Sequence, residues 1–332
     1  MSLRSILALL PILAAGCAGP RLARFEYARP AMGTTFRLVL YAPAPGVADA
    51  AAEAAFARIA ALDASLSDYD ETSELSRLSA ASQGGPMPAP VAVSRALFEV
   101  LAHAEEIAER TDGAFDVTVG PFVRLWRRSA RQGELPSGAR LAEAAPAVGH
   151  RHVALDEGAR TVRLRTGGMR LDLGGIAKGY ALDEALAVLR GLGIERALVD
   201  GGGDIAVGAP PPGSAGWRIA LEGAAPVTLL LARAAVATSG DAYRGVTIDG
   251  VRYSHLVDPR TGLGLTDPIT ATVVASTGMH ADALASAICV LGSEAGLALI
   301  DREAGVEARV VTGQGRGRSA TESAGFARIR VR

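Results

Sequence analysis

The sequence has 332 residues, of which 49% are hydrophobic, so the chain is long enough to bury a sizeable core in one large domain or two modest ones. Its 34 Lys and Arg residues are balanced by 35 Asp and Glu residues. Because no basic stripe alternates with aromatic residues, the composition indicates no nucleic-acid partner.

The first residues, MSLRSILALLPILAAGCAGP, are typical of an export signal. Arg4 precedes an apolar run over residues 6–15 that is too short to span a membrane and suits the hydrophobic region of a signal peptide. Cys17 follows Ala-Ala-Gly and resembles the lipidation site of bacterial lipoproteins, although Ala14 stands where Leu is usual. We expect Cys17 to be lipidated and residues 1–17 to be a lipoprotein signal peptide. The alternative is an ordinary secretory peptide in which Cys17 is incidental.

A lipidated Cys17 would anchor the protein in the bacterial cell envelope, facing the periplasm, in either the inner or the outer membrane. Residues 18–28 are then expected to be a tether. No later change in composition is wide enough to divide residues 29–332, so we expect a single domain. The other cysteine, Cys289, lies in an apolar run and is expected to be a small buried core residue.

The order of the predicted elements favours an α+β fold, a single mixed domain with its sheets flanked by helices, over a regular alternation of parallel strands and helices. Apolar residues at strand or helix spacing and the flanking Gly, Pro and Ser residues define these elements. In chain order they are a strand at 34–42, helices at 46–62 and 94–113, a strand at 168–173, a helix at 180–193, a strand, Gly-rich turn and strand at 195–208, strands at 217–221, 227–232, 235–239 and 269–276, helices at 280–292 and 294–305, and strands at 308–312 and 326–331. Residues 132–148 and 209–216 are expected to be loops.

The segment LDLGGIAKGYALDEA, residues 171–185, combines a Gly turn with the start of a helix. It matches neither the Walker phosphate loop nor the dinucleotide-binding fingerprint, because Lys178 precedes its glycine and no G-x-G-x-x-G is present. A strand, Gly turn and helix nevertheless direct backbone N–H groups at one point, and Lys178 would add a positive charge there. From this segment alone, a structural turn with a solvated lysine is the slightly favoured interpretation.

Asp282 and Ser286 lie four residues apart in a predicted helix and therefore share one face. A carboxylate and a hydroxyl are hard oxygen donors suited to Mg²⁺. The alternative is that Asp282 interacts with the helix dipole and Ser286 is a packing residue. Zinc is disfavoured because the five histidines show no ligand spacing apart from the pair His150 and His152.

Two further segments contain groups that could carry chemistry. In YSHLVDPRTGLG (253–264), His255 could transfer a proton, or a buried Arg260 could form a structural ion pair with Asp258 beside a turn. In SLSDYDETSELSRLS (65–79), Tyr69 lies in an acidic loop without other aromatic residues. It is either a surface tyrosine or a platform on which a flat ring stacks.

Taken together, the motifs of this chain resemble those of the ApbE family of FAD:protein FMN transferases. Eight motifs follow one another in the family's order from residue 32 to about residue 290, which is nearly the whole mature chain. They are MGTTF (32–36), SDYDETSELSRLS (67–79), GAFDVTVGP (113–121), LDLGGIAKGYALDEA (171–185), LVDGGGDI (198–205), ATSGD (237–241), YSHLVDPRTG (253–262) and HADALAS (280–286).

The resemblance implies an enzyme that uses Mg²⁺ and FAD to attach FMN to a Thr or Ser hydroxyl of an acceptor flavoprotein, with release of AMP. It assigns metal binding to Asp282, Ser286 and a backbone carbonyl near Gly175; Ser286 stands where the family often has Thr. Lys178 stands where some relatives carry Glu, and Tyr69 would stack on the isoalloxazine ring. The positions that it assigns to contacts with FAD are Met32, Tyr69, Ala114, Phe115, Asp116, Asp172, Lys178 and Leu256.

The chemistry that the resemblance implies consists mostly of positioning and charge neutralisation. This fits a chain that has no catalytic nucleophile of its own with a general base beside it. We expect Asp282 to act with the metal and His255 or a nearby carboxylate to accept the proton of the acceptor hydroxyl. Two other functions stay open: a periplasmic Mg²⁺-dependent FAD pyrophosphatase, in which water replaces the acceptor, and a non-catalytic flavin-binding lipoprotein. The acceptor protein cannot be named from the sequence.

Overall fold

The structure is a computed structural model that describes residues 21–221, 226–240 and 245–331. The expected signal peptide (1–17), Cys17 and the first part of the expected tether lie outside the described residues, as does Asp241 of the ATSGD motif.

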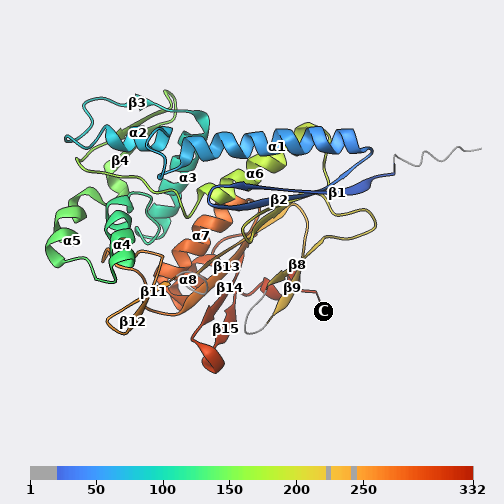
Figure 1. Cartoon of the computed structure of the whole chain (residues 1–332). Coiled ribbons are helices and arrows are strands. Elements are labelled where there is room, and N and C mark those ends of the chain that lie inside the picture. The colour runs from blue at the N-terminus through green and yellow to red at the C-terminus, as the bar shows by residue number, and fades with distance from the viewer. Residues whose placement is uncertain (1–20, 222–225, 241–244, 332) are drawn as a thin grey trace, which may run out of the picture.

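The centre of the fold is a sheet that contains eight strands among the described residues, all paired in antiparallel fashion (Figure 1). From one edge to the other its strands are β1 (Ala23–Ala31), β2 (Thr34–Ala42), β6 (Ala197–Gly201), β7 (Asp204–Val207), β10 (Ala234–Gly240), β13 (Ile269–Ala275), β14 (Glu307–Thr312) and β15 (Ser319–Glu322). Smaller sheets are β3 (Val91–Ala92) with β5 (Thr161–Leu164) and β4 (Val153–Asp156), β8 (Trp217–Leu221) with β9 (Val227–Leu231), and β11 (Gly245–Ile248) with β12 (Val251–Ser254).

Three helices cover one face of the large sheet: α1, α6 and α7 (Figure 1). The remaining α-helices lie around them, with α2, α3, α4 and α5 at the end of the molecule that also holds β3 and β4. The helices are α1 (Pro45–Leu66), α2 (Glu74–Ala80), α3 (Arg95–Arg110), α4 (Gly120–Gln132), α5 (Gly138–Ala144), α6 (Ala177–Gly191), α7 (Gly278–Leu291) and α8 (Ser293–Ile300). This arrangement confirms the predicted α+β class, and α1, α6 and α7 begin and end close to the predicted positions.

The strand sequences explain why the sheet is buried on both faces. In β13, Ala271 and Val273 face the helices, whereas Val274 packs beneath the β8–β9 hairpin on the opposite face. Period-two alternation sends successive side chains to opposite faces, so one strand contributes to two cores. Phe326, in a 3₁₀ turn at Phe326–Ile329, closes the second core.

The N-terminal hairpin corrects the predicted boundary of the tether. Residues 23–28 belong to β1, which pairs with β2 through a tight turn at Met32 and Gly33, both with positive φ (48° and 72°). Two successive positive φ angles match the twist of a two-residue hairpin turn. The second half of the expected tether at 18–28 is therefore strand.

Three other predicted elements differ from the structure. Residues 168–173 form no strand beyond one bridge between Val119 and Arg170, because their backbone groups pair with side chains: Ser79 Oγ accepts from Leu171 N–H at 3.1 Å, and Ser82 Oγ donates to the Met169 carbonyl at 3.1 Å. Of the strand expected at 326–331, Phe326–Ile329 form a 3₁₀ helix and Arg330 makes only an isolated bridge to Leu229. The loop expected at 132–148 contains α5, which Ser137 caps by accepting from Arg140 N–H.

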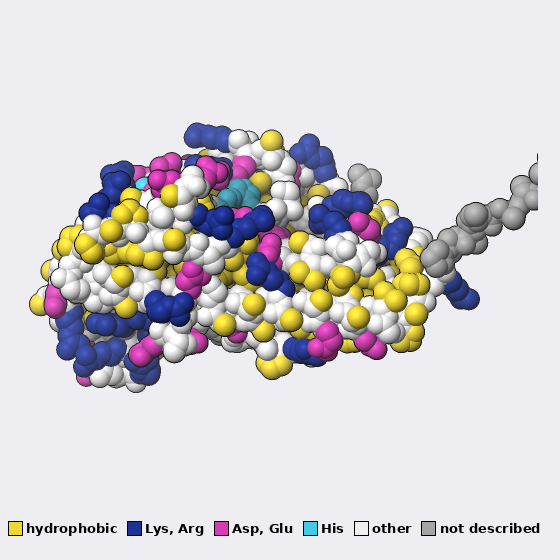
Figure 2. Space-filling model, turned by 90° about the horizontal axis from the view of Figure 1, so that it is seen from above, with side chains coloured by type: hydrophobic (Ala, Val, Ile, Leu, Met, Phe, Trp, Pro, Cys, Tyr) yellow, Lys and Arg dark blue, Asp and Glu magenta, His cyan; other side chains and the backbone are white. Residues whose placement is uncertain are grey.

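The surface agrees with the balanced composition. On the face drawn in Figure 2, positive and negative side chains are interspersed with one another and with hydrophobic ones. Cys289 is buried, as predicted, and forms no disulfide among the described residues.

Candidate active site

The first half of the site lies where α7 passes the turn before α6. Asp282 and Ser286 lie on one face of α7, as their spacing predicts, and Ser286 Oγ is 3.0 Å from Ser239 Oγ on β10. Gly175 lies against this face, because a Cβ atom at Gly175 would be only 2.9 Å from Ser286 Oγ. The structure therefore brings together the three residues predicted as metal ligands.

Two glycines allow the first turns of α6 and α7 to approach this closely. A Cβ atom at Gly179 would lie 2.1 Å from the carbonyl oxygen of Gly278, and one at Gly278 would lie 2.6 Å from the carbonyl oxygen of Gly179. No other residue type fits such a contact between backbones. As a result, the Gly179 N–H reaches across to donate to Asp282 Oδ2 at 3.1 Å.

Asp282 is a buried carboxyl group with a cation beside it. Only 2% of Asp282 is exposed, and burial raises its pKa to about 6. Lys178 opposes this rise from 3.8 Å away, whereas the carboxylate of Asp204 adds to it. Lys178 also contacts Asp204 directly, and it is the only lysine in the sequence. The predicted anion-binding lysine thus lies between two carboxylates.

The donor set at this point suits Mg²⁺. Asp282 and Ser286 offer a carboxylate and a hydroxyl, which are hard oxygen ligands, and the backbone of Gly175 lies against Ser286. Among the residues that the structure describes, no group of three or more His, Cys, Asp and Glu side chains could hold a metal ion.

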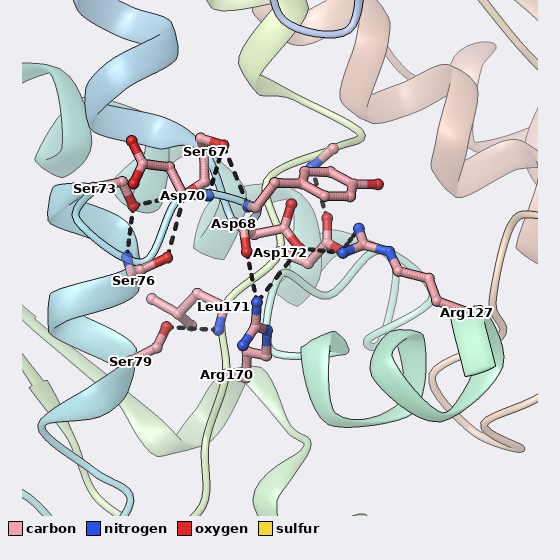
Figure 3. A network of polar contacts seen from close by, with 12 residues as sticks. Ser67, Asp68, Asp70, Ser73, Ser76, Ser79, Arg127, Arg170, Leu171 and Asp172 are labelled. Carbon is pink, nitrogen blue, oxygen red and sulfur yellow. Dashed lines mark hydrogen bonds and ion pairs between the residues drawn. The ribbon is translucent and has the colours of Figure 1, made fainter.

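The second half of the site surrounds Tyr69, on the loop between α1 and α2. Tyr69 is 77% exposed, and the guanidinium carbon of Arg127 lies 4.2 Å from the centroid of its ring. Arg127, on α4, donates to Asp68 Oδ2 at 2.5 Å and to Asp172 Oδ2 at 3.0 Å (Figure 3). Burial raises the pKa of Asp172, with a further contribution from Asp68, while Arg127 lowers it.

A single short segment joins the two halves. Asp172 faces Arg127, and its Oδ1 accepts from the N–H of Gly174 at 2.9 Å; Gly175 follows immediately and contacts Ser286. Phe115, another predicted FAD contact, lies beside Gly175, with its ring 3.3 Å from the place of a Cβ atom there. The predicted metal ligands and the predicted ring platform are thus neighbours in space.

Two of the predicted FAD contacts have structural roles of their own. The carboxylate of Asp116 accepts from Thr118 N–H at 2.7 Å and from His150 N–H at 2.8 Å, and it lies buried beside Ala114 and Phe115. Met32 occupies the tight β-turn, and its N–H donates to Asp63 Oδ2 at 2.8 Å. Their contacts with FAD stay predictions.

His255 and Leu256 lie on the segment after β12. His255 is exposed and Leu256 is half-buried, with the Leu256 N–H donating to Ser254 Oγ at 3.1 Å. The role of His255 as a base stays a prediction. Asp258 and Arg260 form the predicted ion pair, two-pronged at 2.8 and 2.9 Å, but the expectation of a buried arginine is wrong: Arg260 is exposed and Asp258 is the buried partner.

Sequence reasoning missed four residues that the structure places in the site. Asp68, Asp204 and Ser239 lie inside motifs that were already singled out, and Asp68 directly precedes Tyr69. Arg127 had no such signal, because it is one of four arginines in α4 and only the fold shows which of them faces Tyr69.

Within the described residues, no helix is long and apolar enough to cross a membrane.

Comparison with known proteins agrees with this geometry. The sequence model of the ApbE family matches residues 32–310. The chain is 34% identical to an FAD:protein FMN transferase of Treponema pallidum over 88% of this chain and 86% of the relative. It is 33% identical to one of Vibrio cholerae over 87% of this chain and 88% of the relative.

Solved structures show the same fold. The flavin transferase ApbE of Vibrio cholerae superposes with a TM-score of 0.83 at 28% identity, covering 93% of this chain and 99% of that one. The flavinyl transferase ApbE of Pseudomonas stutzeri superposes with a TM-score of 0.82 at 29% identity, covering 93% and 97% of the two chains. A family match over most of the chain, a shared fold and a site at the matching motifs lead to one conclusion: this chain belongs to the ApbE family.

Proposed function

We propose that this protein is an FAD:protein FMN transferase, which moves FMN from FAD to a Thr or Ser hydroxyl of an acceptor flavoprotein and releases AMP. The observation that carries the proposal is the short segment 172–175, which links an exposed tyrosine platform to a cluster of hard oxygen donors. FAD has a flat ring at one end and a pyrophosphate further along, so it needs these two kinds of site close together.

In this proposal the isoalloxazine ring and the pyrophosphate of FAD bind to different parts of the site. The isoalloxazine ring stacks on Tyr69, whose exposed face is available for a flat ligand. The pyrophosphate lies near Lys178, the N-terminal turn of α6 and the donor cluster on α7, where positive charge and backbone N–H groups favour an anion. Binding of both the ring and the pyrophosphate fixes the phosphorus that is attacked relative to the acceptor hydroxyl.

Asp282, Ser286 and the Gly175 carbonyl are the residues that would hold Mg²⁺. When bound there, the ion would supply charge neutralisation for the pyrophosphate and for the AMP that leaves. The remaining steps belong to the chain and its acceptor. The acceptor oxygen bonds to the phosphorus of the FMN half, the bond from that phosphorus to the AMP oxygen breaks, and the hydroxyl proton passes to a base.

We propose His255 as that base, because it is an exposed titratable group next to Leu256, a predicted FAD contact. We also propose that the protein works at the periplasmic side of the cell envelope, held there by a lipid on Cys17. The export signal in the sequence supports this location.

The test of the proposed function is a transfer assay with the chain from Ala18 onward, FAD, Mg²⁺ and a candidate acceptor domain, followed by a denaturing gel. We expect flavin fluorescence on the acceptor band, and we expect Asp282→Ala to lower transfer by about 10²-fold or more, because a metal-binding carboxylate is lost. Asp267→Ala, which removes an exposed carboxylate on a loop, is the matched control and should keep full transfer. Added EDTA should also abolish transfer.

The other outcomes separate the alternatives. A dark gel with free FMN and AMP would support a pyrophosphatase instead, and a dark gel with intact bound FAD, obtained with several acceptors, would support a flavin carrier. The role of His255 is tested in the same assay with His255→Ala. Full transfer by this variant from pH 6 to pH 8, the range in which an unperturbed histidine titrates, would rule out His255 as the base.

A further inference from the structure

An exposed tyrosine is a poor platform unless something holds its ring. Tyr69 is 77% exposed, so packing by apolar neighbours cannot fix its rotamer. Instead the Arg127 guanidinium lies over its ring, 4.2 Å from the centroid. A flat cation on one face of an aromatic ring restricts the ring and leaves its opposite face for another flat group.

Arg127 is itself held in place by two carboxylates. Its Nη1 donates to Asp68 Oδ2 at 2.5 Å and its Nη2 donates to Asp172 Oδ2 at 3.0 Å, and both acceptor side chains are only 10% exposed. Hydrogen bonds between ionised groups are short and directional, and two of them fix the plane of a guanidinium. The flat face of Arg127 therefore has a defined orientation toward Tyr69.

The three segments that carry these residues are joined to one another. Asp172 N–H donates to the Val117 carbonyl at 2.8 Å, and Arg170 Nη2 donates to the backbone carbonyl of Asp68 at 2.5 Å. Gly120, the first residue of α4, allows this junction, because a Cβ atom there would lie 2.3 Å from the Arg170 carbonyl oxygen. Figure 3 shows Arg127 and Arg170 reaching from different segments toward Asp68 and Asp172.

We propose that Arg127 is a positioning residue for FAD: it covers one face of the Tyr69 ring so that the opposite face is oriented for the isoalloxazine. The inference rests on the proposed function, since it takes FAD as the ligand of this site. Arg127 does not touch the flavin in this arrangement and acts through Tyr69. A rigid platform binds more tightly because less side-chain freedom is lost when the ligand arrives.

Arginine is required here for its shape as well as its charge. A lysine at position 127 would keep a positive charge near Asp68 and Asp172 but would lose the planar group that covers the ring. The neighbouring Arg128 is the matched control, because it is exposed and its side chain donates to Gln132 Oε1 at 3.0 Å on another face of α4.

The experiment is an FAD titration of the full chain in the presence of EDTA, followed through the visible absorption band of the flavin, with the unfolding temperature of each variant measured in parallel. We expect Arg127→Lys to weaken FAD binding about tenfold, equivalent to about 1.4 kcal/mol, and to perturb the flavin band while its unfolding temperature stays close to that of the unaltered protein. Arg128→Lys should change neither quantity. Arg127→Met should weaken FAD binding and also lower the unfolding temperature, because Asp68 and Asp172 then lose their shared cation.

A double-mutant cycle with Tyr69→Leu tests whether Arg127 acts through Tyr69. In the Tyr69→Leu background, Arg127→Lys should weaken FAD binding less than about twofold, because the ring that it supports is gone. The inference is overturned if Arg127→Lys binds FAD as tightly as the unaltered protein, or if it causes the same loss with and without Tyr69. An unaltered protein that binds no FAD at all would overturn the proposed function as well, so the two failures can be told apart.

Discussion

At the scale of single residues, the site depends on glycines where a side chain would collide. A Cβ atom at Gly175 would lie 2.9 Å from Ser286 Oγ and 3.3 Å from the Phe115 ring. The segment therefore lies against α7 at a distance that only glycine allows. The same closeness places the backbone of Gly175 beside Ser286, one of the proposed metal ligands.

We predict that Gly175→Ala destabilises the protein by about 1–3 kcal/mol, as overpacking in a well-packed region does, and that it abolishes transfer. Urea unfolding and the gel assay measure the two effects. The control is Gly46→Ala on α1, where a Cβ atom meets nothing within 4 Å and replacement should be neutral or slightly stabilising. A Gly175→Ala protein that transfers FMN at the normal rate would show that this close contact is not needed.

The same scale shows how much of the site could be predicted from the sequence. The spacing of Asp282 and Ser286 places both on one face of a helix, and the structure has them there. Arg127 could not be predicted, since helical spacing does not say which of the α4 arginines faces a loop that lies far away in sequence. Contacts between distant segments depend on the whole fold, whereas i and i+4 neighbours depend on local geometry.

At the scale of elements, the start of α7 is fixed by a carboxylate from α6. Asp183 accepts from Gly278 N–H at 2.6 Å and from Met279 N–H at 2.9 Å, so it caps the helix that carries Asp282. Burial raises the pKa of Asp183 from its ordinary 3.8 to about 6, although both backbone N–H groups oppose the rise; Glu184 adds to it slightly.

This raised pKa predicts a pH dependence of stability. Because the folded state binds the proton more tightly, the contribution of Asp183 to stability is fully present below pH 3.8 and is lost as the pH rises through about 6. Between pH 4.5 and pH 7 the loss amounts to about 2 kcal/mol. Over the same range, the free energy of unfolding of Asp183→Asn should fall by about 2 kcal/mol less than that of the unaltered protein, because the variant lacks the titrating carboxyl group. Urea unfolding of both proteins at pH 4.5 and pH 7 measures this difference. Parallel pH curves for the two proteins would contradict the assignment to Asp183.

Elements whose hydrogen bonds are local were the ones that could be predicted. Residues 45–66 and 278–291 form helices close to the expected limits, because Ala-rich or apolar periodicity and a cap define them. Residues 168–173 were wrongly predicted as a strand, since their apolar alternation is real but Met169 and Leu171 bond to the side chains of Ser79, Ser82 and Gln83 instead of to a neighbouring strand. The pattern of burial can be predicted from the apolar residues of the segment, whereas the identity of the hydrogen-bonding partner cannot.

At the scale of the whole molecule, the distance between the folded domain and the proposed lipid is short. The first strand begins at Ala23, so only residues 18–22 separate it from Cys17. A chain of that length spans at most about 18 Å when fully extended. A lipid on Cys17 would therefore hold the domain close to the membrane, where only acceptors that are exposed near the surface can reach its site.

We predict that Cys17→Ser separates location from chemistry. In cells, the variant should move from the membrane fraction to the soluble fraction, because it lacks the residue to which the lipid attaches. Its transfer activity with a soluble acceptor domain should equal that of the unaltered protein, since Cys17 lies before β1 and the site begins at Met32. Flavinylation of acceptors in the membrane should fall, since a released enzyme is no longer concentrated beside them. Fractionation with immunoblotting, together with flavin fluorescence of membrane proteins on a gel, measures both effects. A variant that stays in the membrane fraction would show that something other than a lipid on Cys17 holds the protein there.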